Sequence, residues 1–61
     1  MARRKYAMYT ANDKRAVCYY DSDLNEHSVT FFRGSEKLVD ADYFTNDRID
    51  ALKTAEHFIN F

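Results

Sequence analysis

The sequence predicts an α+β fold: a small antiparallel sheet of three to four strands, arranged as a β-meander, with one C-terminal helix packed on one face. Two observations predict this architecture. Apolar residues recur with helical period only in residues 45–60, and the chain before them alternates like strands separated by turns. The 61 residues leave room for one domain, spanning 1–61, with a thin core.

The helix is predicted over residues 45–60. A step of about 100° per residue gathers the apolar side chains on one side: Ala51, Leu52, Ala55, Phe58 and Ile59. Thr45 or Asn46 is expected to cap the first turn, where Asp47 complements the helix dipole, and Phe44 is expected to pack back as a hydrophobic staple. A helix of about four turns is unstable alone in water, so this stripe must pack on the sheet.

Three strands are predicted over residues 5–11, 15–20 and 28–33, where β-branched and aromatic residues alternate or cluster. Residues 1–4 are expected to be a frayed basic start. Residues 12–14 form the first hairpin turn, because asparagine and aspartate tolerate the left-handed backbone conformation that such turns require.

The connections between the later strands are predicted from polar residues and the single glycine. Residues 21–27 form a polar connection in which Leu24 tucks back onto the core. Gly34 and Ser35 turn the chain after the third strand. Leu38 and Val39 form a short fourth strand, and residues 40–44 are a loop that leads into the helix.

Both faces of the predicted strands carry apolar side chains, and the register of the strands stays open. Under strict alternation Tyr6 and Met8 lie on one face of the first strand, and Tyr9 lies on the other. One helix covers one face only. The other face must be exposed, covered by residues 36–44 or buried against a second copy, so a homodimer is expected.

Charge is unevenly distributed along the chain. The formal net charge is −1, with nine basic and ten acidic residues. Arg3, Arg4 and Lys5 supply a third of the basic residues, so the rest of the chain is acidic. Most aspartates fall in predicted turns or at helix ends, where a short carboxylate bonds nearby amides. The alternative interpretation is an acidic surface for a basic partner.

The sequence argues against catalysis and against metal or cofactor binding. Asp21, Asp23 and Asn25 match the start of a calcium loop, but the glycine and the bidentate glutamate of that pattern are missing. Cys18 with His27 or His57 offers too few soft ligands for structural zinc. We therefore expect no cofactor, no metal and no enzymatic activity.

The single cysteine and the absence of a signal-like apolar run predict a soluble, cytoplasmic protein without a membrane segment. The favoured function is that of a non-enzymatic interaction protein that binds a protein partner and modulates or inhibits it. Such short chains are common among the accessory proteins of phages and mobile elements. By that analogy, the partner is expected to be a host defence or regulatory protein. The predicted partner-binding residues are Tyr9, Tyr19, Asp21, Asp23, Asp40 and Asp42.

The alternative function is a small nucleic-acid-binding module. In such a module sheet tyrosines and phenylalanines stack on unpaired bases while basic side chains contact phosphates. The candidate basic residues are Arg3, Arg4, Lys5, Lys14, Arg15 and Arg33. The acidic charge of the remaining chain favours a protein partner over a nucleic acid.

Overall fold

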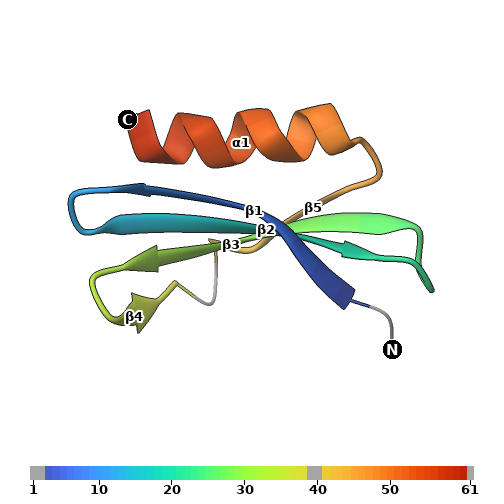
Figure 1. Cartoon of the computed structure of the whole chain (residues 1–61), viewed down its shortest axis with the longest axis horizontal. Helices are drawn as coiled ribbons and strands as arrows, with labels where there is room; N and C mark the ends of the chain where they lie inside the picture. The colour runs from blue at the N-terminus through green and yellow to red at the C-terminus, as the bar shows by residue number, and fades with distance from the viewer. Residues whose placement is uncertain (1–2, 39–40, 61) are drawn as a thin grey trace.

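The computed structural model describes residues 3–38 and 41–60 and confirms the α+β prediction. An antiparallel sheet carries one C-terminal helix on one of its faces (Figure 1). The elements follow the order β1 (Arg3–Ala11), β2 (Lys14–Asp21), β3 (Glu26–Arg33), β4 (Glu36–Lys37), β5 (Tyr43–Thr45) and α1 (Arg48–Asn60).

The first three strands form the predicted meander, and both short strands that follow pair with β3. β4 pairs with the end of β3, where Phe32 lies opposite Lys37. β5 pairs with the beginning of the same edge, where His27 lies opposite Thr45. The sheet therefore has five strands rather than three to four, because two short segments share one edge of β3.

Left-handed backbone occurs at the turns. Asn12 opens the two-residue turn between β1 and β2 with φ 54°, and Gly34 has φ 63° in the turn after β3. The Gly34 amide donates a hydrogen bond to the Asp13 carbonyl at 2.5 Å, which ties these two turns together. These are the turn residues that the sequence predicted.

The connection between β2 and β3 is held by its own aspartate. One carboxylate oxygen of Asp21 accepts hydrogen bonds from the amides of Asp23 at 2.9 Å and Leu24 at 3.3 Å. This self-contained turn directs the Leu24 side chain outward, where it is 68% exposed. The expectation that Leu24 packs onto the core is therefore wrong.

The segment before the helix differs most from its prediction. β4 is Glu36–Lys37 rather than Leu38 with Val39, and β5 occupies part of the predicted loop. Leu38 lies just past β4, where its amide donates to the Phe31 carbonyl at 2.8 Å. Val39 and Asp40 lie outside the described residues. The unpaired edge of β3 supplies the partners that make strands of these segments.

The helix begins at Arg48, three residues later than predicted, and Asp47 is its cap. The Asp47 carboxylate accepts the Ile49 amide at 3.0 Å, and the Thr45 hydroxyl accepts the Asp47 amide at 3.2 Å. The prediction that Thr45 or Asn46 caps the helix is thus wrong. Phe44 is 58% exposed and pairs with Ser28 in β3, so it does not act as a staple.

Small side chains bring the helix close to the sheet. Ala51 and Ala55 are fully buried, as the apolar stripe predicted, and pack with Cys18 and Val29. The Cys18 thiol donates to the Ala51 carbonyl at 3.8 Å. Close packing of this kind depends on the absence of bulk at both alanines.

A bulge in β1 breaks the predicted alternation of its side chains. The register shifts between Lys5 and Ala7, so Tyr6 is the extra residue. Tyr6, Ala7 and Tyr9 all pack against the core beneath the helix. Tyr6 and Met8 therefore do not share a face. Of residues 1–4, for which fraying was expected, Arg3 and Arg4 belong to β1, and residues 1–2 lie outside the described residues.

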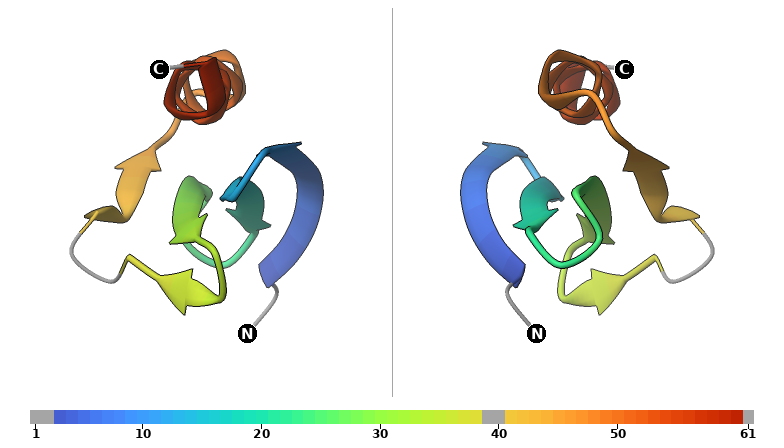
Figure 2. Two further views of the ribbon diagram at one scale, coloured as in Figure 1. Left: turned by 90° about the vertical axis from the view of Figure 1, so that its left-hand side faces the viewer. Right: turned by 90° about the vertical axis from the view of Figure 1, so that its right-hand side faces the viewer.

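The sheet face turned away from α1 is partly covered by the chain itself. Val17 and Thr30 pair across this face and are nearly fully buried. β4 lies on the side of β2 and β3 opposite the helix (Figure 2). Met8, on the same face, is 53% exposed. This partial cover weakens the packing argument for a homodimer, which stays a prediction.

The buried thiol of Cys18 is expected to make the protein less stable at alkaline pH. Burial raises the pKa of the Cys18 thiol above its ordinary value of 9.0. The folded state therefore keeps this proton at pH values where the unfolded chain loses it. The contribution of the buried thiol to the free energy of unfolding is complete below the pKa that Cys18 has in the unfolded chain. It decreases as the pH rises past about 9. Urea denaturation between about pH 8 and pH 10 measures this fall.

The matched variant for this prediction is Cys18→Ala. Its free energy of unfolding is expected to decrease less between about pH 8 and pH 10 than that of the unmodified protein. Equal slopes in the two proteins would show that the thiol does not cause the effect.

Candidate functional site

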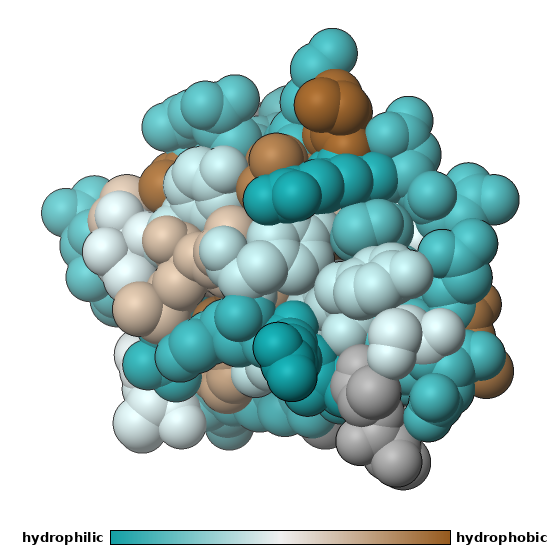
Figure 3. Space-filling view, turned by 45° about the vertical axis from the view of Figure 1, so that its right-hand side comes forward, coloured by the Kyte–Doolittle hydropathy of each residue, from teal (hydrophilic) through white to brown (hydrophobic). Residues whose placement is uncertain are grey.

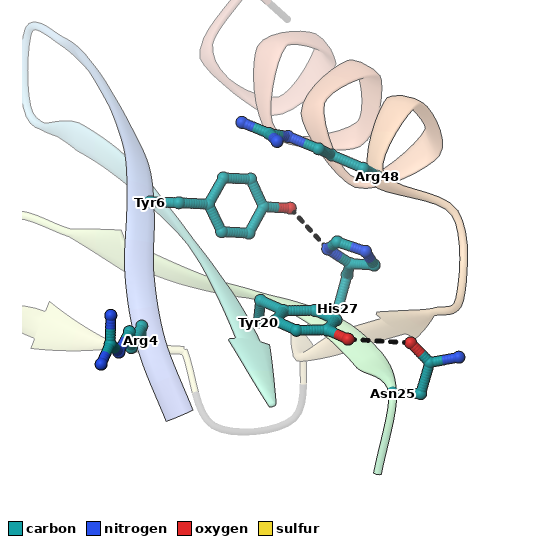
Figure 4. Close-up of a pocket in the computed structure, with 6 residues that line it drawn as sticks. All are labelled: Arg4, Tyr6, Tyr20, Asn25, His27 and Arg48. Carbon is teal, nitrogen blue, oxygen red and sulfur yellow. Dashed lines mark hydrogen bonds between the residues drawn. The ribbon is translucent and has the colours of Figure 1, made fainter. Parts of the chain in front are cut away.

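A pocket of about 430 Å³ opens at the end of the molecule where α1 begins. Figure 4 shows the side chains around it. They come from β1, β2, β3, the turn before β3 and the first residue of the helix. The pocket is lined by Arg4, Tyr6, Tyr20, Asn25, His27 and Arg48.

Strand register brings most of these residues together. Arg4 lies opposite Tyr20, and Tyr20 lies opposite His27, so all three share the face that carries α1. The β1 bulge turns Tyr6 toward the same space. The Asp47 cap starts the helix so that Arg48 is its first residue, above the rings (Figure 4).

Three aromatic rings form the wall of the pocket. The Tyr6 ring meets His27 edge to face, with centroids 5.6 Å apart and planes at 83°. The Tyr6 hydroxyl is hydrogen-bonded to Nδ1 of His27 at 3.0 Å. Tyr20 lies on the other side of the imidazole, with centroids 4.8 Å apart. These contacts hold the rings in a defined arrangement.

The Tyr20 ring is anchored at its far end as well. Its hydroxyl donates to Oδ1 of Asn25 at 2.8 Å. Asn25 has a left-handed backbone with φ 51°, a conformation that asparagine tolerates better than most residues. The turn thus places an amide group at the rim of the pocket and fixes Tyr20.

Two arginines give the pocket its charge. The Arg48 guanidinium lies 4.9 Å from the centroid of the Tyr6 ring, a cation–π contact. Arg4 also lines the pocket and is exposed, and Figure 4 draws its guanidinium on the outer side of β1, away from the three rings. Within the described part of the chain, neither guanidinium forms an ion pair with a carboxylate. Both retain donors for an external anion.

Arg48 stands where the helix itself disfavours a cation. The first turn of a helix carries a partial positive charge, so an arginine there costs a few tenths of a kcal/mol, up to about 1 kcal/mol. The ring of Tyr6 offsets part of this cost. An anion in the pocket would be attracted by the guanidinium, whereas the helix terminus already carries the Asp47 carboxylate as its cap.

Tyr6 remains a neutral hydrogen-bonding group near neutral pH. Burial, with a smaller contribution from nearby Cys18, raises its pKa above the ordinary value of 10.0, while the charge of Arg48 acts in the opposite direction. A protonated phenol beside an imidazole offers hydrogen bonds to a ligand. The pocket is therefore suited to binding an anion that carries a planar group.

The predicted partner-binding residues are not brought together. Tyr9 is half-buried against the core under α1, and Tyr19 lies on the opposite face beneath Arg3, whose guanidinium is 4.1 Å from the ring centroid. Asp21 and Asp23 belong to the turn before β3. Asp42 is exposed before β5, and Asp40 lies outside the described residues. Their partner-binding role stays a prediction.

From the sequence alone, Arg4 is the one pocket residue named individually for a binding role, as a basic residue of the alternative function. Asn25 and His27 enter there only as possible calcium and zinc ligands, and Tyr20 and Arg48 are not singled out. One signal was available, since an arginine in the first turn of a helix opposes the helix dipole. The other pocket residues are brought together by the strand register and by the bulge in β1, which the sequence does not reveal.

Polar side chains of the calcium-loop pattern form hydrogen bonds within the protein. Asp21 and Asn25 use their side-chain oxygens within the protein, on turn amides and on Tyr20. Residues 3–38 and 41–60 contain no group of three or more histidines, cysteines or acids placed to hold a metal ion. In the same residues no helix has the length and apolar character to span a membrane.

The surface at this end of the molecule is mixed rather than broadly apolar. Figure 3 brings this end forward and shows teal and pale side chains, with brown ones in small separate groups.

Comparison with known proteins found no matching family model, no matching curated protein and no matching solved structure. Any account of function therefore depends on the chemistry of the pocket.

Proposed function

We propose that this chain is a non-enzymatic binding protein that recognises an anionic segment of another macromolecule at the pocket. One observation carries the proposal. Two arginines that form no ion pair within residues 3–38 and 41–60, Arg4 and Arg48, line a pocket walled by aromatic rings. Arginine binds carboxylate or phosphate through several directed hydrogen bonds, which makes it suited to this task.

The local charge of the pocket differs from that of the whole chain. The chain carries a formal net charge of −1, yet its ten acidic residues contribute none of the six pocket-lining side chains. Acids also lie near this end without lining the pocket, since Asp47 caps the helix directly before Arg48, and Asp21 and Asp23 belong to the turn before β3. Anion binding here therefore depends on the two guanidiniums rather than on the charge of the wider surface.

The chemistry of the single thiol supports binding rather than nucleophilic catalysis. Cys18 is buried beneath α1 and bonded to the Ala51 carbonyl. Burial raises its pKa, so the thiol is protonated at neutral pH, while the thiolate is the reactive form. The pocket itself offers hydrogen-bond donors and ring faces.

The partner, the compartment and the biological role extend this proposal. We propose a cytoplasmic protein that modulates or inhibits the macromolecule it binds, as accessory proteins of phages and mobile elements do. The two arginines of the pocket favour an acidic partner over the basic partner that an acidic surface would select. Both an acidic protein segment and a nucleic acid meet this requirement.

Fluorescence anisotropy with two labelled probes tests the proposal. The probes are a single-stranded oligonucleotide and an acidic peptide of equal charge, each titrated with the full chain at low and moderate salt. The double variant Arg4→Gln with Arg48→Gln is expected to weaken binding of at least one probe tenfold or more, since hydrogen bonds to charged groups contribute about 1.5–3 kcal/mol each.

The control is the double variant Arg33→Gln with Lys53→Gln. It removes the same two charges from exposed positions that do not line the pocket. Its affinity is expected to change less than about threefold at moderate salt. Equal losses in the two double variants would show that net charge, rather than the pocket, governs binding. Failure of both probes to bind would overturn the proposal.

A further inference from the structure

We infer that the pocket holds one nucleotide of a single-stranded nucleic acid, with its phosphate bound by the arginines that line the pocket and its base stacked on Tyr20. This inference rests on the proposed function and names its ligand. It adds a second requirement, the presence of a base, to the requirement for negative charge. In a single-stranded nucleic acid, each phosphate is accompanied by an unpaired base, which is a planar group able to stack on an aromatic ring.

Tyr20 is a preorganised stacking platform. His27 contacts its ring at a centroid distance of 4.8 Å, and Asn25 accepts its hydroxyl at 2.8 Å. The side chain is half-buried, so part of the ring stays accessible at the pocket. Because the ring is held before binding, stacking a base on it costs little conformational entropy.

Polar groups beside the ring can contact the edge of a base. Asn25 uses Oδ1 to accept the Tyr20 hydroxyl, which leaves its amide N–H groups for an external acceptor. His27 uses Nδ1 in its bond to Tyr6, which leaves Nε2 for a ligand. A base presents carbonyl oxygens and ring nitrogens that pair with such groups.

The basic start of β1 extends the charged surface beyond the pocket. Arg4 faces the pocket, while its neighbours Arg3 and Lys5 lie on the other side of the strand. Arg3 stacks on Tyr19 with its guanidinium 4.1 Å from the ring centroid. A nucleic-acid strand that passes around the outer edge of β1 would meet these cations in addition to Arg4.

The size of the pocket favours a single strand over a duplex. A volume of about 430 Å³ is sufficient for one nucleotide. A base inside a duplex is paired and stacked, and reaching Tyr20 would require it to leave the helix. An acidic peptide supplies charge but no base, so Tyr20, Asn25 and His27 would be left without their ligand groups.

The test compares two oligonucleotides of about eight units, a length within the usual site size of small single-strand binders. One is oligo-thymidine and the other is an abasic strand with the same number of phosphates. The unmodified chain is expected to bind oligo-thymidine about tenfold more tightly or better, because stacking on an aromatic side chain favours the strand that has bases.

Three variants assign this difference to Tyr20. Tyr20→Leu is expected to bind both strands equally weakly, whereas Tyr20→Phe keeps the ring and stays within about threefold of the original preference. Tyr43→Leu removes an exposed tyrosine that does not line the pocket, and its preference is expected to be unchanged. Circular dichroism verifies that each variant is folded.

The outcomes separate this inference from the proposed function. Equal affinity for the two strands, with the arginine dependence retained, would overturn base stacking and leave anion binding intact. Binding of the acidic peptide without either strand would show that the partner is a protein. Binding of no probe would overturn both. If Tyr20→Leu does not fold, the Tyr20→Phe variant and the affinities of the unmodified chain for oligo-thymidine and the abasic strand still test whether a base stacks on Tyr20.

Discussion

Replacing Ala55 by aspartate is expected to unfold the protein. Ala55 is fully buried, with an exposed fraction of 0%, and it packs against the sheet beside Ala51 and Cys18. A carboxylate there would be buried without a partner, which costs several kcal/mol. Domains are stable by about 5–15 kcal/mol, and a chain this short has a thin core. Circular dichroism and urea denaturation measure the effect.

Lys53→Asp is the matched control, because it introduces the same side chain on the exposed face of the same helix. This variant is expected to stay folded. Leu52→Asp, which the helical pattern alone also predicts to unfold the chain, ranks below Ala55→Asp because Leu52 is half-buried. A cooperatively folded Ala55→Asp protein would contradict the packing of α1 on the sheet.

Replacing Phe31 by alanine has the second largest expected effect, a loss of about 3–5 kcal/mol in the free energy of unfolding. Phe31 is 6% exposed, and its ring lies 4.7 Å from that of Phe58, centroid to centroid. The substitution removes this contact and leaves a cavity between β3 and α1. Urea denaturation with a common slope for both proteins measures the loss.

Phe44→Ala is the control, since it makes the same chemical change at a side chain that is 58% exposed. Its expected loss is below about 1 kcal/mol, the range of strand propensity. If Phe44→Ala cost as much as Phe31→Ala, Phe44 would be buried in solution, as a staple or against a second copy of the chain.

Most of the regular structure could be predicted from local patterns. The meander of β1 to β3 follows from alternation and from turn residues such as Asn12 and Gly34, whose backbone conformations are local properties. The buried stripe of the helix follows from its period, and Ala51 and Ala55 are buried as predicted. Such signals require no knowledge of distant residues.

Short segments could not be predicted, because their partners determine their structure. Glu36–Lys37 and Tyr43–Thr45 are strands because the edge of β3 leaves backbone groups to pair. Phe44 is apolar in the sequence but exposed, since pairing with Ser28 turns it away from α1. No local pattern contains the position of that edge.

The candidate site was the least predictable part. Arg4 and Arg48 are separated by most of the chain, and the turn at Asn25 holds Tyr20 by a bond that only the folded hairpin permits. The six residues predicted to bind a partner share only their residue types, and the fold places the five that lie within the described residues on more than one surface.

By itself the sequence determined that the chain is α+β, with a meander and an amphipathic C-terminal helix, because periodicity and turn chemistry act over a few residues. Tertiary structure alone decided which side chains share a face. The bulge at Tyr6 and the helix start at Arg48 direct these two residues toward His27. A shift of one residue in either element would move its side chain away from the pocket, so the site depends on register rather than on composition.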